Sequence, residues 1–119
     1  MILVVEDDPQ VARLIALVLQ RNGHTCEVVA DGQTALERAV EMRPSIIFAD
    51  LTIKGMGGQQ LCSALKATEE TRRIPYVVIS GDRDIAEKAR DCGADDFMGK
   101  PFEFEDLISL VRKYARAQS

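Results

Sequence analysis

The chain has 119 residues, of which 46% are hydrophobic and 29% are charged, and its formal net charge is −4. This length fits one domain, which we expect to span residues 1–119, and the composition argues against disorder. The acidic balance offers no basic patch that could follow a phosphate backbone, so we expect no direct contact with nucleic acid. No apolar run approaches the roughly 18 residues that a membrane helix needs, so no membrane contact is expected.

Cysteine usage indicates the compartment. Cys26, Cys62 and Cys92 are odd in number and include no Cys-x-x-Cys pair. Such spacing predicts neither a disulfide framework nor a zinc site. The first residues also lack the length and flanks of a signal peptide. We therefore expect a reducing, cytoplasmic setting.

Short apolar runs and helical patterns alternate along the chain. The runs, several of them rich in Val and Ile, predict strands at residues 2–5, 26–30, 46–49, 76–79 and 96–99. Apolar residues at helical spacing predict helices around residues 11–19, 35–40, 61–65, 83–91 and 107–115. Strict alternation of strand and helix predicts an α/β fold with a parallel sheet that is covered by helices on both faces.

Reactive residue types follow four of the predicted strands. Glu6 and Asp7 follow the first strand, Asp50 the third, Ser80 the fourth and Lys100 the fifth. In doubly wound sheets, ligands bind outside the carboxyl ends of the strands. We therefore expect carboxylates, a hydroxyl and an ammonium group to converge there.

Each of these residues also has a plain structural interpretation. Asp8 before Pro9 is a good helix N-cap, and a lone Lys100 is usually a solvated charge. Because reactive residue types occur at four strand ends together, we interpret them as one functional site instead. Clustered carboxylates repel one another unless a cation joins them, and hard oxygen ligands suit Mg²⁺. A carboxylate can also attack phosphorus and form an aspartyl phosphate.

Four motifs carry a family resemblance over essentially the whole chain. They are ILVVEDDP at 2–9, IIFAD at 46–50, IPYVVISGD at 74–82 and GADDFMGKPF at 93–102. In these segments the chain resembles the receiver domain of two-component response regulators. The resemblance implies a doubly wound, five-stranded parallel sheet in the order 2-1-3-4-5, a flavodoxin-like, CheY-like three-layer sandwich.

The resemblance also implies roles at the centre of the site. Asp50 matches the phospho-acceptor, and Glu6 and Asp7 match the acidic pair that holds Mg²⁺ (or Mn²⁺) together with Asp50. The backbone carbonyl of Thr52 falls where the family has a further metal ligand. Lys100 matches the phosphate-binding lysine, so we expect its removal to leave stability unchanged or higher.

Further roles lie around this centre. Ser80 and Phe97 match the switch hydroxyl and the switch aromatic, and the bond before Pro101 is cis in the family. Thr52 and Asp82 lie two residues beyond Asp50 and Ser80, where we expect them to tune the lifetime of the phosphoryl group. Because Phe97 has no hydroxyl to hold it at the surface, we expect it to be buried even before phosphorylation.

The implied function is a phosphoryl-accepting signalling switch, which catalyses only its own phosphorylation and dephosphorylation. Its donor would be a sensor histidine kinase or a histidine phosphotransfer protein. The output would pass to a downstream protein through the fourth predicted helix, the strand at 96–99 and the fifth predicted helix. The resemblance is compatible with a monomer or a phosphorylation-dependent dimer.

Alternatives and departures remain. A pseudo-receiver would bind partners without phosphorylation, but it usually lacks the acceptor, the acid pair or the lysine. A dehalogenase-like phosphatase needs a second acid where Thr52 stands. A flavin-binding protein with a flavodoxin-like fold is also disfavoured, because Glu6 and its acidic neighbours would repel the flavin phosphate. Lys54 replaces the proline of the family pattern, and the glycines of the following GMGG make the loop permissive.

Overall fold

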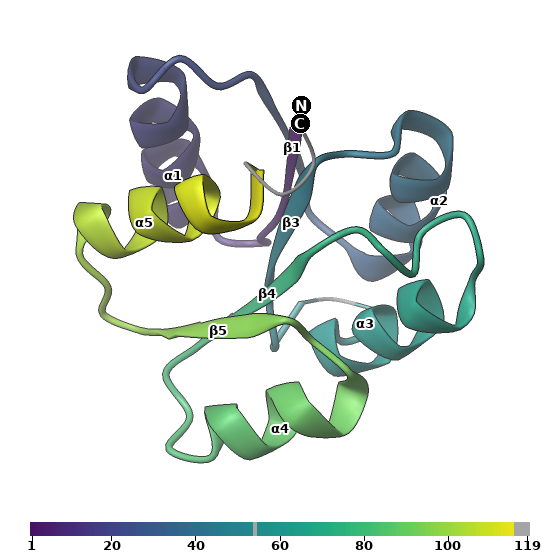
Figure 1. The fold of residues 1–119 in the computed structure, drawn as a ribbon. Helices are drawn as coiled ribbons and strands as arrows, with labels where there is room; N and C mark the ends of the chain where they lie inside the picture. The colour runs from purple at the N-terminus through teal and green to yellow at the C-terminus, as the bar shows by residue number, and fades with distance from the viewer. Residues whose placement is uncertain (54, 116–119) are drawn as a thin grey trace.

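The computed structural model describes residues 1–53 and 55–115, so Lys54 lies outside the described residues. In these residues, strands and helices alternate from end to end (Figure 1). The strands are β1 (Ile2–Val5), β2 (Cys26–Val29), β3 (Ile46–Asp50), β4 (Tyr76–Ser80) and β5 (Asp96–Gly99). The helices are α1 (Pro9–Arg21), α2 (Gly32–Met42), α3 (Gly58–Ala67), α4 (Ile85–Cys92) and α5 (Phe104–Ala115). None of the described helices has the length and apolar character needed to cross a bilayer.

The five strands form one parallel sheet in the order β2-β1-β3-β4-β5, which confirms the predicted fold. Two strands run one residue further than their apolar runs predicted. Asp50 is still paired with Ile79, and Ser80 is paired with Gly99. The ladder therefore carries both polar side chains to the carboxyl edge of the sheet and fixes their positions.

Helices cover both faces of the sheet (Figure 1). Helices α1 and α5 lie on one face, and α2, α3 and α4 lie on the other. Successive residues of β1 alternate between these layers: Ile2 and Val4 pack under α1 and α5, whereas Leu3 and Val5 pack under the other helices. A strand covered on both sides has no solvent face, and this explains its unbroken apolar run.

Helix α1 begins and ends as its sequence predicts. The Asp8 carboxylate accepts a hydrogen bond from the Gln10 amide at 2.9 Å, and Pro9 occupies the first turn. Gly23 follows the last turn with φ +86°, a left-handed conformation that glycine adopts without strain. Asp8 is thus a helix cap, and it is exposed rather than part of the site.

A lysine and a carboxylate join three elements near the amino end of the sheet. The Lys66 ammonium of α3 donates to the carbonyl oxygen of Ile74 at 2.9 Å and to Asp95 Oδ2 at 2.7 Å. The same Asp95 oxygen accepts a hydrogen bond from the Tyr76 amide at 2.8 Å. We call these four residues the Lys66 clamp. It ties the end of α3 to the starts of β4 and β5.

The glycines that follow Asp50 have different structural reasons. Gly55 has φ +72°, which other residues rarely adopt. Gly57 has φ −65°, and a Cβ there would lie 3.7 Å from the nearest atom, the Leu51 carbonyl oxygen. At Gly58, a Cβ would lie 2.2 Å from the carbonyl oxygen of Asp50. The first turn of α3 therefore packs directly against the backbone of Asp50.

We expect Gly58→Ala to lower the free energy of unfolding by about 1–3 kcal/mol, because the methyl group must push α3 away from Asp50. Urea denaturation followed by circular dichroism measures the change. Gly57→Ala is the matched control. Gly57 is the N-cap of α3, where Ala is less favourable than Gly, so its stability should fall by less than about 1 kcal/mol. Equal stability of the two variants would contradict the close contact.

Candidate functional site

The predicted site residues converge at the carboxyl edge of the sheet. Glu6 follows β1, Asp50 ends β3, Ser80 ends β4 and Lys100 follows β5. The side chains of the first three are almost fully buried, with at most 4% of each residue exposed. Polar groups buried so deeply need partners, since each unpaired one costs free energy.

Lys100 supplies the central partner. Its ammonium group donates to Glu6 Oε1 at 3.1 Å and also to Asp50 Oδ2. Its backbone amide donates to the Ser80 carbonyl oxygen at 2.9 Å, and the following bond to Pro101 is cis, as the resemblance implied. A residue that alone would be a solvated charge is therefore held between two buried carboxylates from β1 and β3.

The remaining carboxylate oxygens are also satisfied. Asp50 Oδ1 accepts hydrogen bonds from the Thr52 amide at 2.9 Å and from the Thr52 hydroxyl at 3.0 Å. Glu6 Oε2 accepts one from the Asp8 amide at 3.3 Å. Both oxygens of Asp50 are thus oriented by named donors, one from the loop after β3 and one from the segment after β5.

These contacts shift the pKa values of the Glu6 and Asp50 carboxyl groups in opposite directions. Burial raises the pKa of Glu6, and the nearby Asp50 charge adds to the rise. Burial alone would also raise the pKa of Asp50, but hydrogen bonds from Lys100 and Thr52 outweigh it and hold the pKa below its ordinary value. The pKa of Lys100 is raised by its two carboxylate partners against the opposing effect of burial. Asp50 is therefore ionised near neutral pH, beside a charged ammonium group.

Asp7 shares no hydrogen bond or ion pair with this cluster in the described residues. We expected Glu6 and Asp7 to face Asp50 across the site. Within the described ranges, no three acidic, histidine or cysteine side chains gather as metal ligands, and Lys100 lies between Glu6 and Asp50. Asp7 lies half-buried where the chain leaves β1 for α1. The donor set nevertheless suits Mg²⁺, which needs only one or two carboxylates and keeps several waters.

Lys88 contributes to the rim of the site, although the sequence analysis did not assign it there. The Ser80 hydroxyl accepts a hydrogen bond from the Asp82 amide at 3.0 Å. Asp82 does not cap α4, since Asp84 holds that position; its carboxylate instead pairs with Lys88 at 2.8 Å. The four-residue spacing from Asp84 to Lys88, typical of helical ion pairs, was the available signal.

Phe97 corrects one expectation. It is 42% exposed, not buried. Phe97 is paired with Val78, so both side chains lie on the α4 side of the sheet. The interior on that side is already filled by Val78, Ile85 and Ala89. We therefore expect that an inward Phe97 requires α4 to shift.

The geometry around Lys100 reverses our expectation about stability. In buffer without divalent cations, Lys100→Met should lower the free energy of unfolding by about 2–3 kcal/mol near neutral pH, because two buried carboxylates lose their cation. Removing the cation raises their folded-state pKa values, so the penalty exists while they are ionised and shrinks as falling pH protonates them. Thermal melts across a pH series measure this.

Lys113→Met is the matched control, because Lys113 pairs with Asp96 at the surface. Its loss should cost at most about 1 kcal/mol. A Lys100→Met penalty that stays constant or grows as the pH falls would contradict the assigned ion pairs.

Comparison with known proteins agrees with this geometry. The DNA-binding response regulator MtrA of Mycolicibacterium smegmatis is 35% identical over 117 residues, which cover 97% of this chain and 50% of MtrA. The chain thus spans about half the length of the first curated relatives that it matches. Because such relatives are named as DNA-binding, they give no support to our expectation of no nucleic-acid contact.

Solved receiver domains share the fold over nearly their full length. The receiver domain of NtrX from Brucella abortus is 33% identical, with a TM-score of 0.86 and complete coverage of both chains. The receiver domain of the sensor histidine kinase PA1611 from Pseudomonas aeruginosa is 26% identical, with a TM-score of 0.90 over 97% of this chain and 96% of that one. In the latter, a magnesium ion is coordinated in the active site cleft.

The family model described as the response regulator receiver domain matches residues 2–112. This match covers all four motifs and every predicted site residue. The chain therefore belongs to the receiver-domain family of two-component response regulators.

Proposed function

We propose that this receiver unit, residues 1–119, is a switch that accepts a phosphoryl group on Asp50 from a sensor histidine kinase or a histidine phosphotransfer protein. The observation that carries the proposal is the state of Asp50. Its carboxylate is ionised, it lies at the carboxyl end of a central strand, and both its oxygens are oriented by hydrogen bonds.

The transfer needs little from the protein beyond position and charge. An Asp50 oxygen attacks phosphorus, an acyl–phosphate bond forms, and the bond to the donor histidine nitrogen breaks, with its electron pair returning to the imidazole. The product places about −1.5 to −2 charge at the site. Lys100, which already contacts Asp50, then pairs with that charge.

Magnesium, or manganese, would be held by the carboxylates of Glu6, Asp7 and Asp50 and by the Thr52 carbonyl oxygen. When bound, it would neutralise charge on the transferring group. The donor chemistry of these residues supports the assignment, as does the magnesium ion of the PA1611 receiver domain. Lys100, which pairs with Glu6 and Asp50 here, would pair with the charge of the phosphoryl group once these carboxylates hold the metal.

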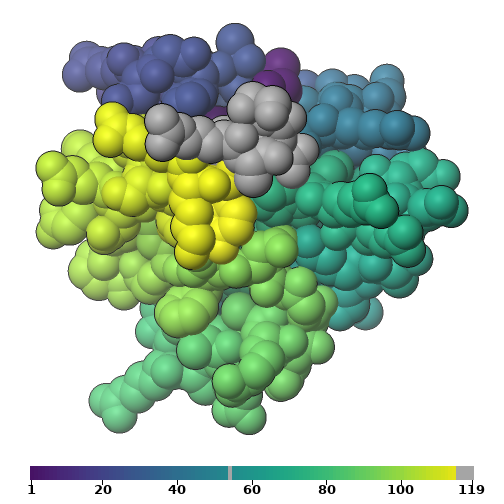
Figure 2. All heavy atoms as spheres, in the orientation of Figure 1, coloured from purple at the N-terminus to yellow at the C-terminus, as the bar shows by residue number. Residues whose placement is uncertain are grey.

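The output surface consists of α4, β5 and α5. Figure 2 shows these elements, in green to yellow, adjoining one another on one face of the molecule. Ser80 would leave the Asp82 amide and donate to the phosphoryl group, and Phe97 would turn inward as α4 shifts. A downstream protein, or a second copy of the chain, would bind this altered face.

The mass of the chain tests the acceptor directly. After incubation with acetyl phosphate and Mg²⁺, the chain should gain the mass of one phosphoryl group. Asp50→Asn should gain none, and excess EDTA should abolish the gain. A gain that persists in Asp50→Asn would contradict the assignment of Asp50, and no gain in the parent chain would favour a partner-binding pseudo-receiver.

Following the same mass over time tests the rim residues. Thr52 and Asp82 lie where water reaches the acyl phosphate, and Asp82 can orient that water. Asp82→Ala should therefore slow the loss of the phosphoryl group severalfold. Asp84→Ala removes the other carboxylate that pairs with Lys88 and should leave the rate unchanged. Equal rates in both variants would assign Asp82 a purely structural role.

Nuclear magnetic resonance locates the output surface. Amide shifts on phosphorylation should concentrate in residues 83–99 and at the start of α5, because an inward Phe97 displaces α4. Phe97→Ala removes the ring that must turn, so the shifts in α4 should shrink while those around Asp50 remain. Shifts confined to α1 and α2 would refute this choice of face.

A further inference from the structure

Two cysteine side chains meet where α3 packs against α4. These helices lie next to each other on one face of the sheet (Figure 1). The Cys62 thiol of α3 donates to the carbonyl oxygen of Cys92, the last residue of α4, at 3.3 Å. The Cys92 thiol in turn donates to the carbonyl oxygen of Ala89 at 3.4 Å. Both cysteines are free, buried and part of one apolar cluster. We call this contact between the two helices the α3–α4 seam.

Contacts on both sides hold the two cysteines opposite each other. One turn earlier on each helix, Gln59 Nε2 donates to the carbonyl oxygen of Lys88 at 3.3 Å. One turn further along α3, Lys66 of the clamp donates to Asp95 at 2.7 Å. The three pairs are separated by 29, 30 and 29 residues in the chain, so the seam has one constant register. A bond between the two sulfurs therefore needs no change of register, and it replaces only two weak sulfur hydrogen bonds.

Burial controls how these thiols react. It raises the pKa of the Cys62 thiol well above its ordinary value, and the Cys92 thiol beside it adds to the rise. The thiolate, which is the reactive form, is therefore scarce while the seam is closed. Cys62 is fully buried and Cys92 is 6% exposed, so an oxidant reaches Cys92 first as α4 opens locally. Only three of the eight residues of α4 are buried, and an element with so little buried surface opens more readily than the core strands.

We propose that Cys62 and Cys92 are a redox-sensitive pair, which a peroxide oxidises to a disulfide that ties α4 to α3. The Cys92 sulfur attacks one oxygen of hydrogen peroxide, the O–O bond breaks, and a sulfenic acid and one water form. The Cys62 sulfur then attacks the sulfenic sulfur, so that the S–S bond forms, the S–O bond breaks and a second water leaves. The two sulfurs together lose two electrons to the peroxide, and both thiol protons end in water.

The disulfide would restrain the element that the proposed output has to move. We expect an inward Phe97 to require a shift of α4, and a bond from Cys92 to Cys62 would hold the carboxyl end of α4 in place. The hydrogen bonds of Asp50 involve neither cysteine. Oxidation should therefore leave phosphoryl acceptance intact and weaken the response of α4. This consequence rests on the proposed function, whereas formation of the disulfide does not.

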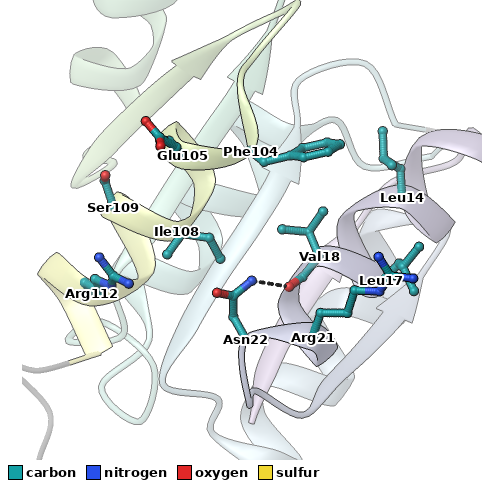
Figure 3. A pocket seen from close by; sticks show the side chains of 10 residues that line it. All are labelled: Leu14, Leu17, Val18, Arg21, Asn22, Phe104, Glu105, Ile108, Ser109 and Arg112. Atoms are coloured by element: carbon teal, nitrogen blue, oxygen red, sulfur yellow. Dashed lines mark hydrogen bonds between the residues drawn. The ribbon is translucent and has the colours of Figure 1, made fainter.

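The opposite face of the sheet provides internal references. Cys26 of β2 packs with the apolar cluster on that face, so the sheet separates it from the pair. A groove of about 600 Å³ lies between α1 and α5 on the same face (Figure 3). None of the residues that line this groove belongs to α3 or α4. Oxidation of the pair should therefore leave the amides of α1 unaffected.

The test uses the full chain with Cys26→Ser, which leaves the two thiols of the pair. Hydrogen peroxide should remove both free thiols and the mass of two hydrogen atoms, and a dithiol reductant should restore them. Trypsin should release residues 55–66 and 91–112 as one linked species, since the bond before Pro101 resists cleavage. Amide hydrogen exchange in α4 should slow by about tenfold or more in the oxidised chain, with exchange in α1 unchanged.

Cys62→Ala combined with Ser63→Cys is the matched control. It moves the thiol one position along α3, from the seam to the exposed face of the helix. This variant should keep two free thiols under the oxidation that links the parent. Circular dichroism melts verify that it is folded, and the linked tryptic species of the parent provides a readout that needs no substitution in the seam.

Several results would overturn the proposal. A disulfide that forms only in urea would show that the folded seam keeps the sulfurs apart, and equal linking in the matched control would remove the role of the seam. Oxygen added to the cysteines without a linked species would do the same.

Phosphorylation tests the consequence for the switch. After incubation with acetyl phosphate and Mg²⁺, the oxidised chain should gain the same mass as the reduced chain, whereas its amide shifts in α4 should shrink severalfold. Unchanged shifts would contradict the restraint on α4. A reduced chain that gains no phosphoryl mass would count against the phospho-acceptor alone, because the linked species and the exchange rates do not involve Asp50.

Discussion

One ammonium group between two buried carboxylates holds the carboxyl edge of this sheet together. Glu6 and Asp50 end up almost fully buried, and burying an unpaired carboxylate costs several kcal/mol. The cation that offsets this cost, Lys100, lies beyond the last strand, whereas Glu6 follows the first strand and Asp50 ends the third. The pairing therefore depends on the whole strand order. An anion bound at Asp50 would compete for this lysine, and binding at the site would then be coupled to the packing of the sheet edge.

Much of the fold follows from patterns that are local in the sequence. Runs such as residues 2–5 are continuously apolar because helices cover both faces of the sheet, and Asp8 before Pro9 marks the start of α1 by its own chemistry. Glu6, Asp50, Ser80 and Lys100 come together because they lie at the carboxyl ends of the strands, and this does not depend on their side-chain conformations. The strand order itself came from the family resemblance, because periodicity alone does not say which strands are neighbours.

The remaining features depend on contacts between distant segments, which no local pattern encodes. Whether Lys100 or a metal lies between Glu6 and Asp50 depends on side-chain conformation, so the sequence alone did not predict the ion pairs of Lys100. The exposure of Phe97 depends on how fully Val78, Ile85 and Ala89 fill the space beneath α4. Likewise, nothing in the sequence distinguishes Gly58, which must lie against the Asp50 carbonyl, from Gly57, which need not.

The Lys66 clamp gives the sheet two unlike ends. Near its amino edge, one ammonium group and one carboxylate join α3, β4 and the segment before β5 through hydrogen bonds of 2.7–2.9 Å. At its carboxyl edge, the bonds of Ser80 and Lys100 are those that a phosphoryl group would exchange. Because the clamp holds the starts of β4 and β5, an exchange of partners beside Asp50 would displace the carboxyl ends of these two strands more than their amino ends.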